Sequence, residues 1–378
     1  MNFTPLEQAV SQVLDAGMTP ALQLAIRRHG RLIYSAAAGW LDPDSRRLVT
    51  TITTRFDMAS VTKLFTTTCF MRLVEAGRVG LDQPVSTVLP AFSGLRPLHP
   101  YEDPLQEGVW VDVADEKTRQ VDAGQTTFRQ LLCHNSGLPA WRPFKEQPDA
   151  AAARQMALET FFSYLPGERI VYSDVGLILL GLAVEALTGQ RLDEAIRQRV
   201  TQPLGLQHTG YLPIGAIPPE VDLGDVAPTE FCRWRNRRVI GEVHDESTSR
   251  LGGIAGHAGI FSTAEDIARF GQVFLDHGSP LLSGASVSEM VRVQAEYEGA
   301  RRGLGFALWS ADPEASSNPF SPATFGHTGF TGTSLWMDPE RQLVVALLTN
   351  EVYNGRTSRA ILGLRLAIHR AIVAMVEA

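Results

Sequence analysis

Apolar residues form strand-like runs near both ends of the chain, and they have helical spacing between those ends. Residues 21–39 form two alternating runs around His29-Gly30, which predicts a β-hairpin. Towards the other end, strands are predicted at 303–310, 327–338 and 343–350. Because helices lie between these strands in the sequence, we expect one sheet built from both termini, with a mostly helical lobe inserted in the middle.

The strands and helices together predict an α/β (α+β) fold, with an antiparallel sheet flanked by helices. Apolar spacing predicts helices at 1–17, 56–80, 126–134, 149–164, 172–188, 191–201, 262–278 and 359–378. The helix at 262–278 has a clear start signal, a capping box that begins at Ser262. We expect residues 1–58 and 252–378 to form the α/β lobe, residues 59–251 the helical lobe, and the active site to lie between them. Residues 92–125 lack periodicity, which indicates a functional loop or a disordered insertion.

The charge balance argues against a nucleic-acid partner. The chain has 378 residues, with 34 basic and 41 acidic side chains and a net charge of −7, and it lacks a long basic run. Neutralising phosphates requires basic patches. The N-terminus has no signal-peptide pattern, and the longest apolar stretch, 175–187, contains Glu185 and falls short of the roughly 20 residues that span a bilayer. We therefore expect a cytoplasmic protein without a membrane partner.

Cysteine and histidine spacing gives no support for a metal or a cofactor. Cys69, Cys133 and Cys232 are scattered, and none belongs to a C-x-x-C pair. His244-Asp245 and His257 lack the helical spacing of paired metal ligands, so loop or supporting roles are preferred for them. We expect no metal and no cofactor.

The first chemical motif is Ser60-x-x-Lys63, at the start of the helix predicted at 56–80. Residues three apart share a helical face, so the hydroxyl and the amine can meet. Serine is a weak nucleophile until a neighbouring base takes its proton, and a partly desolvated lysine can be that base. Lys63 is also one of only three lysines among 34 basic residues, with Lys117 and Lys145.

Two further motifs contain side chains suited to proton transfer and binding. Tyr172-Ser173-Asp174 opens an apolar helix, where the tyrosine is either half-buried core or a phenol that relays protons near an ammonium group. His327-Thr328-Gly329 precedes the C-terminal hairpin, so its strand edge can line a cleft. The same letters recur at His208-Thr209-Gly210, but those residues lead into a proline-rich loop. We therefore assign the functional role to His327.

These three motifs, in this order and at these spacings, resemble the serine β-lactamase and penicillin-binding-protein superfamily. The order is most similar to the class C branch, which includes class C β-lactamases, DD-peptidases, D-aminopeptidases and family VIII carboxylesterases. Segments 128–139, 172–181 and 256–270 also resemble recurring segments of these hydrolases. The resemblance extends over roughly residues 20–375.

The resemblance implies a role for each matching residue. Ser60 would be the nucleophile, Lys63 its activating partner and Tyr172 the general base that later protonates the leaving group. His327 stands where many relatives have lysine, and the N–H groups of Ser60 and Phe330 would form the oxyanion hole. The residues expected at substrate and oxyanion contacts are Trp141, Asp174, His327, Thr328, Gly329 and Phe330.

Two positions depart from the family pattern and bear on the substrate. Asp174 stands where β-lactamases usually have asparagine, and an ionised carboxylate cannot donate to the acyl-amide carbonyl of a β-lactam. Trp141 stands about where class C enzymes have a polar amide side chain. Both departures favour an ester or peptide substrate. The alternative is that Asp174 holds Lys63 charged, which passes more of the base role to Tyr172.

We therefore expect a serine hydrolase that forms an acyl-enzyme with a small-molecule ester, amide or peptide. A carboxylesterase or small-amide hydrolase is favoured, and a DD-peptidase, a D-aminopeptidase or a weak β-lactamase is the alternative. A catalytically silent scaffold is disfavoured, because it would have no need of Lys63 in a chain that otherwise uses arginine. The natural substrate and the oligomeric state stay open at this stage.

Overall fold

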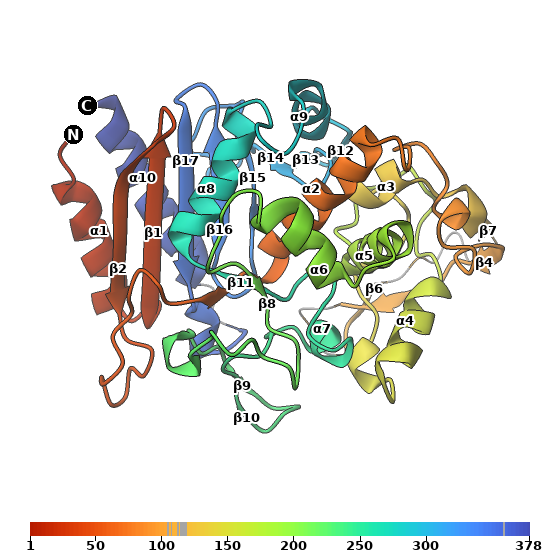
Figure 1. Cartoon of the computed structure of the whole chain (residues 1–378), viewed down its shortest axis with the longest axis horizontal. Coiled ribbons are helices and arrows are strands. Elements are labelled where there is room, and N and C mark those ends of the chain that lie inside the picture. Colours follow the sequence, from red (N-terminus) through yellow and green to blue (C-terminus); the bar gives the residue numbers. More distant parts are fainter. Residues whose placement is uncertain (104–105, 107, 112, 114–118, 358–359) are drawn as a thin grey trace.

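An eight-stranded antiparallel sheet forms one side of the protein (Figure 1). The computed structural model describes all residues except 104–105, 107, 112, 114–118 and 358–359. In sheet order the strands are β12 (Ala295–Tyr297), β13 (Ala300–Arg302), β14 (Ala307–Leu308), β15 (Phe325–Thr328), β16 (Ser334–Asp338), β17 (Leu343–Thr349), β1 (Ala21–Arg28) and β2 (Arg31–Gly39). The N-terminal hairpin joins the C-terminal strands where β1 pairs with β17, in a register that sets Leu24 opposite Leu347. This confirms the expected sheet built from both termini.

Helices cover both faces of the sheet because the strands are apolar on both faces. Leu22, Leu24 and Ile26 of β1 join the core cluster under α1 (Thr4–Asp15) and α10 (Ala360–Glu377). The alternate residues Ala21 and Ala25 of β1 join the cluster on the other face, where α8 (Ala264–Leu275) packs. Figure 1 shows α1 and α10 on one side of the sheet and α8 on the other.

The helical lobe lies beside α8 and the sheet (Figure 1). Its helices are α2 (Thr62–Glu75), α3 (Phe128–Leu132), α4 (Ala150–Leu158), α5 (Asp174–Thr188), α6 (Leu192–Ile196) with a π-helical continuation (Arg197–Thr201), and α7 (Glu246–Arg250). Phe65 of α2 stacks on Phe270 of α8 with ring centroids 4.1 Å apart, which joins the lobe to the sheet layer.

A close backbone approach fixes where α5 lies relative to the neighbouring loop. A Cβ atom on Gly256 would lie 2.0 Å from the Leu177 carbonyl oxygen, and one on Gly181 would lie 3.0 Å from the Gly256 nitrogen. Only glycine allows this contact. It brings the loop that contains His257 against the first turns of α5.

Short strands complete the fold. A three-stranded sheet is ordered β3 (Phe56–Asp57), β11 (Ile260–Ser262), β8 (Gly210–Tyr211), and β3 leads directly into the turn that contains Ser60. The region at 92–125, expected to be a functional loop or a disordered insertion, contains two antiparallel strand pairs in its described part. These pairs are β4 (Leu95–Pro97) with β7 (Gln120–Asp122) and β5 (Tyr101–Glu102) with β6 (Trp110–Val111). The rest of that region, Lys117 included, lies outside the described residues. One more pair is β9 (Phe231–Cys232) with β10 (Arg237–Arg238).

Several predicted elements have different bounds in the structure. The strand predicted at 303–310 shrinks to β14, because the N–H groups of Leu304 and Gly305 donate to carbonyls of Met290 and Leu132 instead of to a neighbouring strand. The helix predicted to extend to residue 164 ends at Leu158, after which Tyr164 donates its N–H to Gly137.

Other local predictions also needed the structure. The capping residue of α8 is Thr263 and not Ser262, since the Thr263 hydroxyl accepts from the Asp266 N–H. Neither the β12–β13 hairpin nor α9 (Gly284–Val291) was predicted. In the part of the chain that the structure describes, no single helix is long and apolar enough to cross a membrane. The pair α5 and 192–201 meets that criterion only as a unit bent by 77°.

Candidate active site

The candidate nucleophile Ser60 lies in a strained turn between β3 and α2. A 3-10 turn spans Ala59–Val61, and Ala59 has φ +44°, a left-handed conformation that is costly for a residue with a Cβ. The Asp57 carboxylate supports this turn, because Oδ1 accepts from the Ala59 N–H at 2.8 Å and Oδ2 from the His244 N–H at 2.6 Å. Asp57 is buried, and burial raises the pKa of its carboxyl against the lowering effect of those two N–H groups.

Lys63 is fully buried one helical turn after Ser60, and its ammonium group has three acceptors. Nζ lies 2.9 Å from Ser60 Oγ, 2.7 Å from Asp174 Oδ1 and 3.4 Å from the His257 carbonyl oxygen. Burial by itself lowers the pKa of Lys63, but the charge of Asp174 and the proximity of Tyr172 outweigh it and leave the pKa raised. Two of these contacts are hydrogen bonds, to Ser60 Oγ and the His257 carbonyl, and the contact with Asp174 is an ion pair. Lys63 is therefore held protonated.

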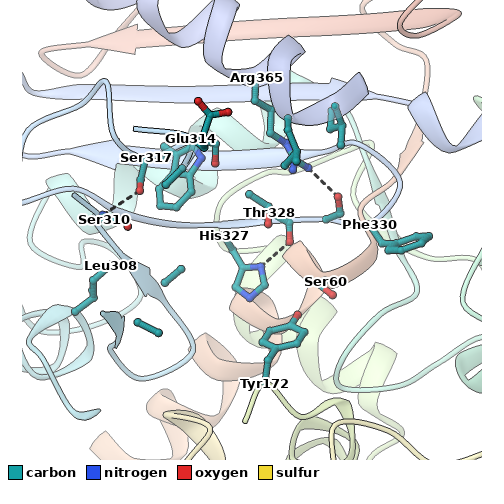
Figure 2. Close-up of a pocket in the computed structure, with 18 of the residues that line it drawn as sticks. Ser60, Tyr172, Leu308, Ser310, Glu314, Ser317, His327, Thr328, Phe330 and Arg365 are labelled. Atoms are coloured by element: carbon teal, nitrogen blue, oxygen red, sulfur yellow. Dashed lines mark hydrogen bonds between the residues drawn. The ribbon is translucent and has the colours of Figure 1, made fainter. Parts of the chain in front are cut away.

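His134 holds Tyr172 in place through hydrogen bonds to the residues before and after it. The His134 carbonyl accepts from the Val171 N–H at 2.9 Å, and His134 Nδ1 accepts from the Ser173 N–H at 3.0 Å. The two rings lie 4.7 Å apart between centroids. Lys63 Nζ lies 4.6 Å from the centroid of the Tyr172 ring, and Figure 2 shows the Tyr172 hydroxyl pointing toward Ser60.

His134 is neutral, and its tautomer is defined by these contacts. Since Nδ1 accepts a hydrogen bond, the proton lies on Nε2, which is buried and has no hydrogen-bond partner among the described residues. Burial, followed by the nearby charges of Arg302 and Lys63, lowers the pKa of His134 well below its ordinary value. No functional role was assigned to His134 from the sequence, and the structure places its ring directly against Tyr172.

His327 lies on β15 and is also a neutral, oriented imidazole. Its Nδ1–H donates to the Thr328 carbonyl at 2.7 Å, which leaves Nε2 as an acceptor. Burial first, then the charges of Lys63 and Arg302, lower the pKa of His327 to about 3. Nε2 is buried and without a hydrogen-bond partner among the described residues. Relatives with lysine at this position have a cation here, and this chain has an uncharged acceptor.

The turn after β15 is joined to the turn that contains Ser60. The Thr331 hydroxyl donates to the Asp57 carbonyl at 2.7 Å, and the Thr333 hydroxyl donates to the Met58 carbonyl at 3.0 Å. A Cβ atom on Gly329 would lie 2.5 Å from that same Met58 oxygen, so the close approach requires glycine. These contacts set the β15 edge beside the nucleophile.

Two backbone N–H groups remain available for an oxyanion. The Ser60 N–H belongs to the first turn of a helical segment, where N–H groups have no intrahelical partner. The Phe330 N–H follows β15 and has no backbone acceptor among the described residues. The Phe330 ring is 42% exposed and stacks on His244 with centroids 5.5 Å apart. This geometry is compatible with the expected oxyanion hole.

A cavity of about 570 Å³ connects these groups. Ser60, Tyr172, His327, Thr328 and Phe330 line it, as Figure 2 shows. Neither Asp174 nor Trp141 is among its lining residues.

Asp174 and Trp141 have other partners. Asp174 pairs with Lys63, which is the alternative placement that the sequence left open. The Trp141 indole N–H donates to the Glu102 carbonyl, and its ring packs near Tyr101 and Tyr164, so it contacts the 92–125 region and does not face the cavity.

Sequence reasoning missed several supporting groups. Asp57, His134 and Arg302 contact or face the site, but no motif or spacing marks them. His257 was assigned a supporting role, and its ring Nε2 lies 2.9 Å from Asp245 while its carbonyl accepts from Lys63. Among the described residues, no three His, Cys, Asp or Glu side chains gather as metal ligands would.

A serine whose hydroxyl accepts from a buried ammonium, with a tyrosine aimed at it and free N–H groups beside it, defines a serine hydrolase site for acyl transfer. The comparison with protein families agrees, since residues 6–368 match the family model described as Beta-lactamase. The chain belongs to this β-lactamase family of serine hydrolases, which confirms the resemblance inferred from the motifs.

Three similar proteins share between 21% and 29% sequence identity with the chain. The chain is 29% identical over 387 aligned residues to a putative D-alanyl-D-alanine carboxypeptidase of Escherichia coli K12, covering 93% of this chain and 83% of that protein. The solved structure of EstCE1, a hydrolase with promiscuous acyltransferase activity, matches with a TM-score of 0.74 at 21% identity, over 97% of this chain and 98% of that one. Simvastatin synthase from Aspergillus terreus matches with a TM-score of 0.74 at 22% identity, over 98% and 94% of the two chains. At these identities the two structures show the shared fold alone.

Proposed function

We propose that the protein hydrolyses esters and small amides or peptides through an acyl-enzyme on Ser60, with Tyr172 as the general base. The observation that carries this proposal is the coordination of Lys63. Nζ donates to Ser60 Oγ and to the His257 carbonyl, and the adjacent Asp174 carboxylate raises the pKa of Lys63, so Lys63 is an ammonium that cannot take a proton.

The proton of Ser60 therefore needs another acceptor, and Tyr172 is the group aimed at it (Figure 2). As Ser60 Oγ forms a bond to the acyl carbon, its proton moves to the Tyr172 oxygen beside the Lys63 ammonium, while the phenol passes its own proton on toward the leaving group. The carbonyl oxygen becomes an oxyanion between the N–H groups of Ser60 and Phe330. The bond to the leaving group then breaks, and that group receives the proton from Tyr172.

Water completes the cycle by the same route. Tyr172 takes a proton from a water molecule, and the water oxygen attacks the acyl carbon of the Ser60 ester. The bond between the acyl carbon and Oγ breaks, and Oγ recovers the proton from Tyr172. Lys63 stays an ammonium throughout and stabilises the negative charge that develops on either oxygen.

Esters and small amides or peptides are the proposed substrate class. A neutral His327 favours substrates that need no cation at this position of the β15 edge. A second candidate is a carboxypeptidase acting on peptides that end in D-amino acids. It is supported by the similarity to proteins named putative D-alanyl-D-alanine carboxypeptidases, at 28–29% identity over more than nine-tenths of this chain.

Covalent labelling tests the proposal directly. A fluorophosphonate probe is expected to label Ser60 in the unmodified protein, and Ser60→Ala is expected to lose both labelling and hydrolysis while its circular dichroism spectrum is kept. A panel of short p-nitrophenyl esters, D- and L-amino-acid anilides and a D-alanyl-D-alanine peptide then ranks the substrates. Labelling of another serine, or hydrolysis that survives in Ser60→Ala, would contradict the proposed mechanism.

A further inference from the structure

The catalytic cavity is positively charged although the protein is acidic. Four arginines and two glutamates are among the lining residues, whereas the whole chain has a net charge of −7. The arginines are Arg301, Arg302, Arg356 and Arg365, and the glutamates are Glu314 and Glu351. An excess of one sign in a cleft attracts ligands of the other sign.

Two of these arginines already have partners in the protein. Arg356 pairs with Glu230 and with Glu246, the latter at 3.1 Å. Arg365 is buried and donates to the carbonyls of Gly329 at 2.8 Å and Thr333 at 2.6 Å. Their hydrogen-bonding capacity supports the fold around the β15 turn.

Arg302 is different, because its guanidinium contacts the ring of Tyr172 but has no acidic partner among the described residues. It lies on β13 and lines the cavity, and among the described residues its side chain forms no hydrogen bond and no ion pair. Its Nε atom is fully buried and unsatisfied. Burial disfavours the charged form and lowers the pKa of Arg302, which the proximity of Tyr172 only partly offsets. A half-buried guanidinium that lines a cavity and has no acidic partner in the described protein is available to meet its counter-charge in a ligand.

The position of Arg302 connects it to the reaction. Its guanidinium carbon lies 5.4 Å from the centroid of the Tyr172 ring, on the same cavity wall that leads to Ser60. A substrate anion bound to Arg302 would therefore be only a few covalent bonds away from the acyl carbon that Ser60 attacks. His327, which also lines the cavity, is neutral and offers only an acceptor, so it cannot provide the positive charge instead.

We propose that Arg302 is the substrate-recognition residue of this site and that it binds a carboxylate on the substrate, close to the ester or amide bond that Ser60 attacks. A carboxylate matches the planar fork of a guanidinium with two hydrogen bonds, and Arg302 has its donors free for it. This inference rests on the proposed acyl-enzyme function, and it narrows the substrate class to carboxylate-bearing esters, amides and peptides.

Matched substrates isolate the charge. In the first pair, 3-acetoxybenzoate and 3-acetoxybenzamide, the leaving group has a carboxylate in one member and a neutral amide in the other. In the second pair, phenyl hydrogen succinate and phenyl succinamate, the same difference lies on the acyl group. We expect kcat/KM to favour the carboxylate member of at least one pair by about 10- to 100-fold, the range for a hydrogen bond to a charged group. Arg302→Gln is expected to remove that preference, and Arg302→Lys to keep part of it.

Arg301→Gln is the matched control, since Arg301 is the neighbouring arginine that also lines the cavity. It is expected to keep most of the preference. The proposal is overturned if the unmodified protein prefers neither carboxylate, or if Arg301→Gln and Arg302→Gln reduce the preference equally. It is also overturned if Arg302→Gln slows both members of a pair by the same factor, because Arg302 then acts on Tyr172 and not on the substrate.

Equilibrium binding separates this inference from the proposed function. Binding of the four esters to Ser60→Ala, followed by calorimetry, needs no turnover. Tighter binding of a carboxylate ester that is lost on adding Arg302→Gln supports the role of Arg302 even if the unmodified protein hydrolyses none of the four. Equal affinities for charged and neutral members would overturn it even if all four are hydrolysed.

Discussion

Replacing Asp174 by asparagine tests the ion pair on which the state of Lys63 depends. Asp174 Oδ1 lies 2.7 Å from Lys63 Nζ, and Lys63 is completely buried whereas the Asp174 side chain is 31% exposed. Leaving a buried charge without its partner costs about 3–5 kcal/mol. Because water screens part of this pair, we expect the lower end, a loss of about 3 kcal/mol in the free energy of unfolding at neutral pH.

The same substitution is expected to change the pH dependence of activity. In the unmodified protein the pKa of Lys63 is raised, so the ion pair contributes its full stability below the unfolded pKa of lysine and loses it as the pH rises through the folded pKa. In Asp174→Asn burial dominates, and the pKa of Lys63 falls below its ordinary value. The ammonium is then lost at lower pH, and the alkaline limb of the kcat/KM profile is expected to move to lower pH.

Urea denaturation and a pH–rate profile with a short p-nitrophenyl ester measure both effects. Asp193→Asn is the control, because Asp193 also lies in the first turn of a helix and pairs with a cation. Its partner, Arg191, has an exposed side chain, whereas Lys63 is buried. The control is expected to lose less than about 1 kcal/mol and to keep the wild-type pH profile. An Asp174→Asn protein with the alkaline limb of the wild type and the stability of the control would refute the assignment of Lys63 as an ammonium held by Asp174.

Three further predictions concern the same site. Tyr172→Phe is expected to lower kcat/KM for esters by about 10²- to 10⁴-fold, the usual effect of losing a group that transfers a proton, and full activity in this variant would exclude Tyr172 as the base; Lys63→Arg keeps the positive charge and is expected to lose less than Tyr172→Phe. His134→Ala is expected to lower kcat with a small change in KM, and His134→Asn to recover part of the loss, because asparagine tolerates the φ of +60° and offers an acceptor to the Ser173 N–H; equal losses in both variants would contradict this positioning role. Nitrocefin turnover is expected to be weak, and since Asp174 faces Lys63, Asp174→Asn is expected to leave the ratio of ester to nitrocefin hydrolysis unchanged; a ratio that shifts toward nitrocefin would instead place Asp174 against the substrate.

The large features of the fold could be predicted from local patterns. Residues 21–26 and 343–349 are almost entirely buried because helices cover both faces of the sheet, and short apolar runs of this kind predict strands without knowledge of what lies opposite. Boundaries were less predictable. The strand predicted at 303–310 is mostly a turn, because carbonyls from the distant residues Met290 and Leu132 accept its N–H groups.

The sequence by itself brought the candidate nucleophile Ser60 to Lys63, because the two are three residues apart where a 3-10 turn leads into α2, and their meeting follows from helical geometry. The tertiary structure decided what those residues can do. Lys63 is an ammonium only because α5 brings Asp174 to it and the loop at His257 adds a carbonyl, and both partners lie more than 100 residues away along the chain. Arg302 likewise faces Tyr172 across the cavity without any motif to mark it. The burial and charge pairing of a side chain depend on all the groups that lie near it in space. A pattern of residues along the sequence does not show which groups those are.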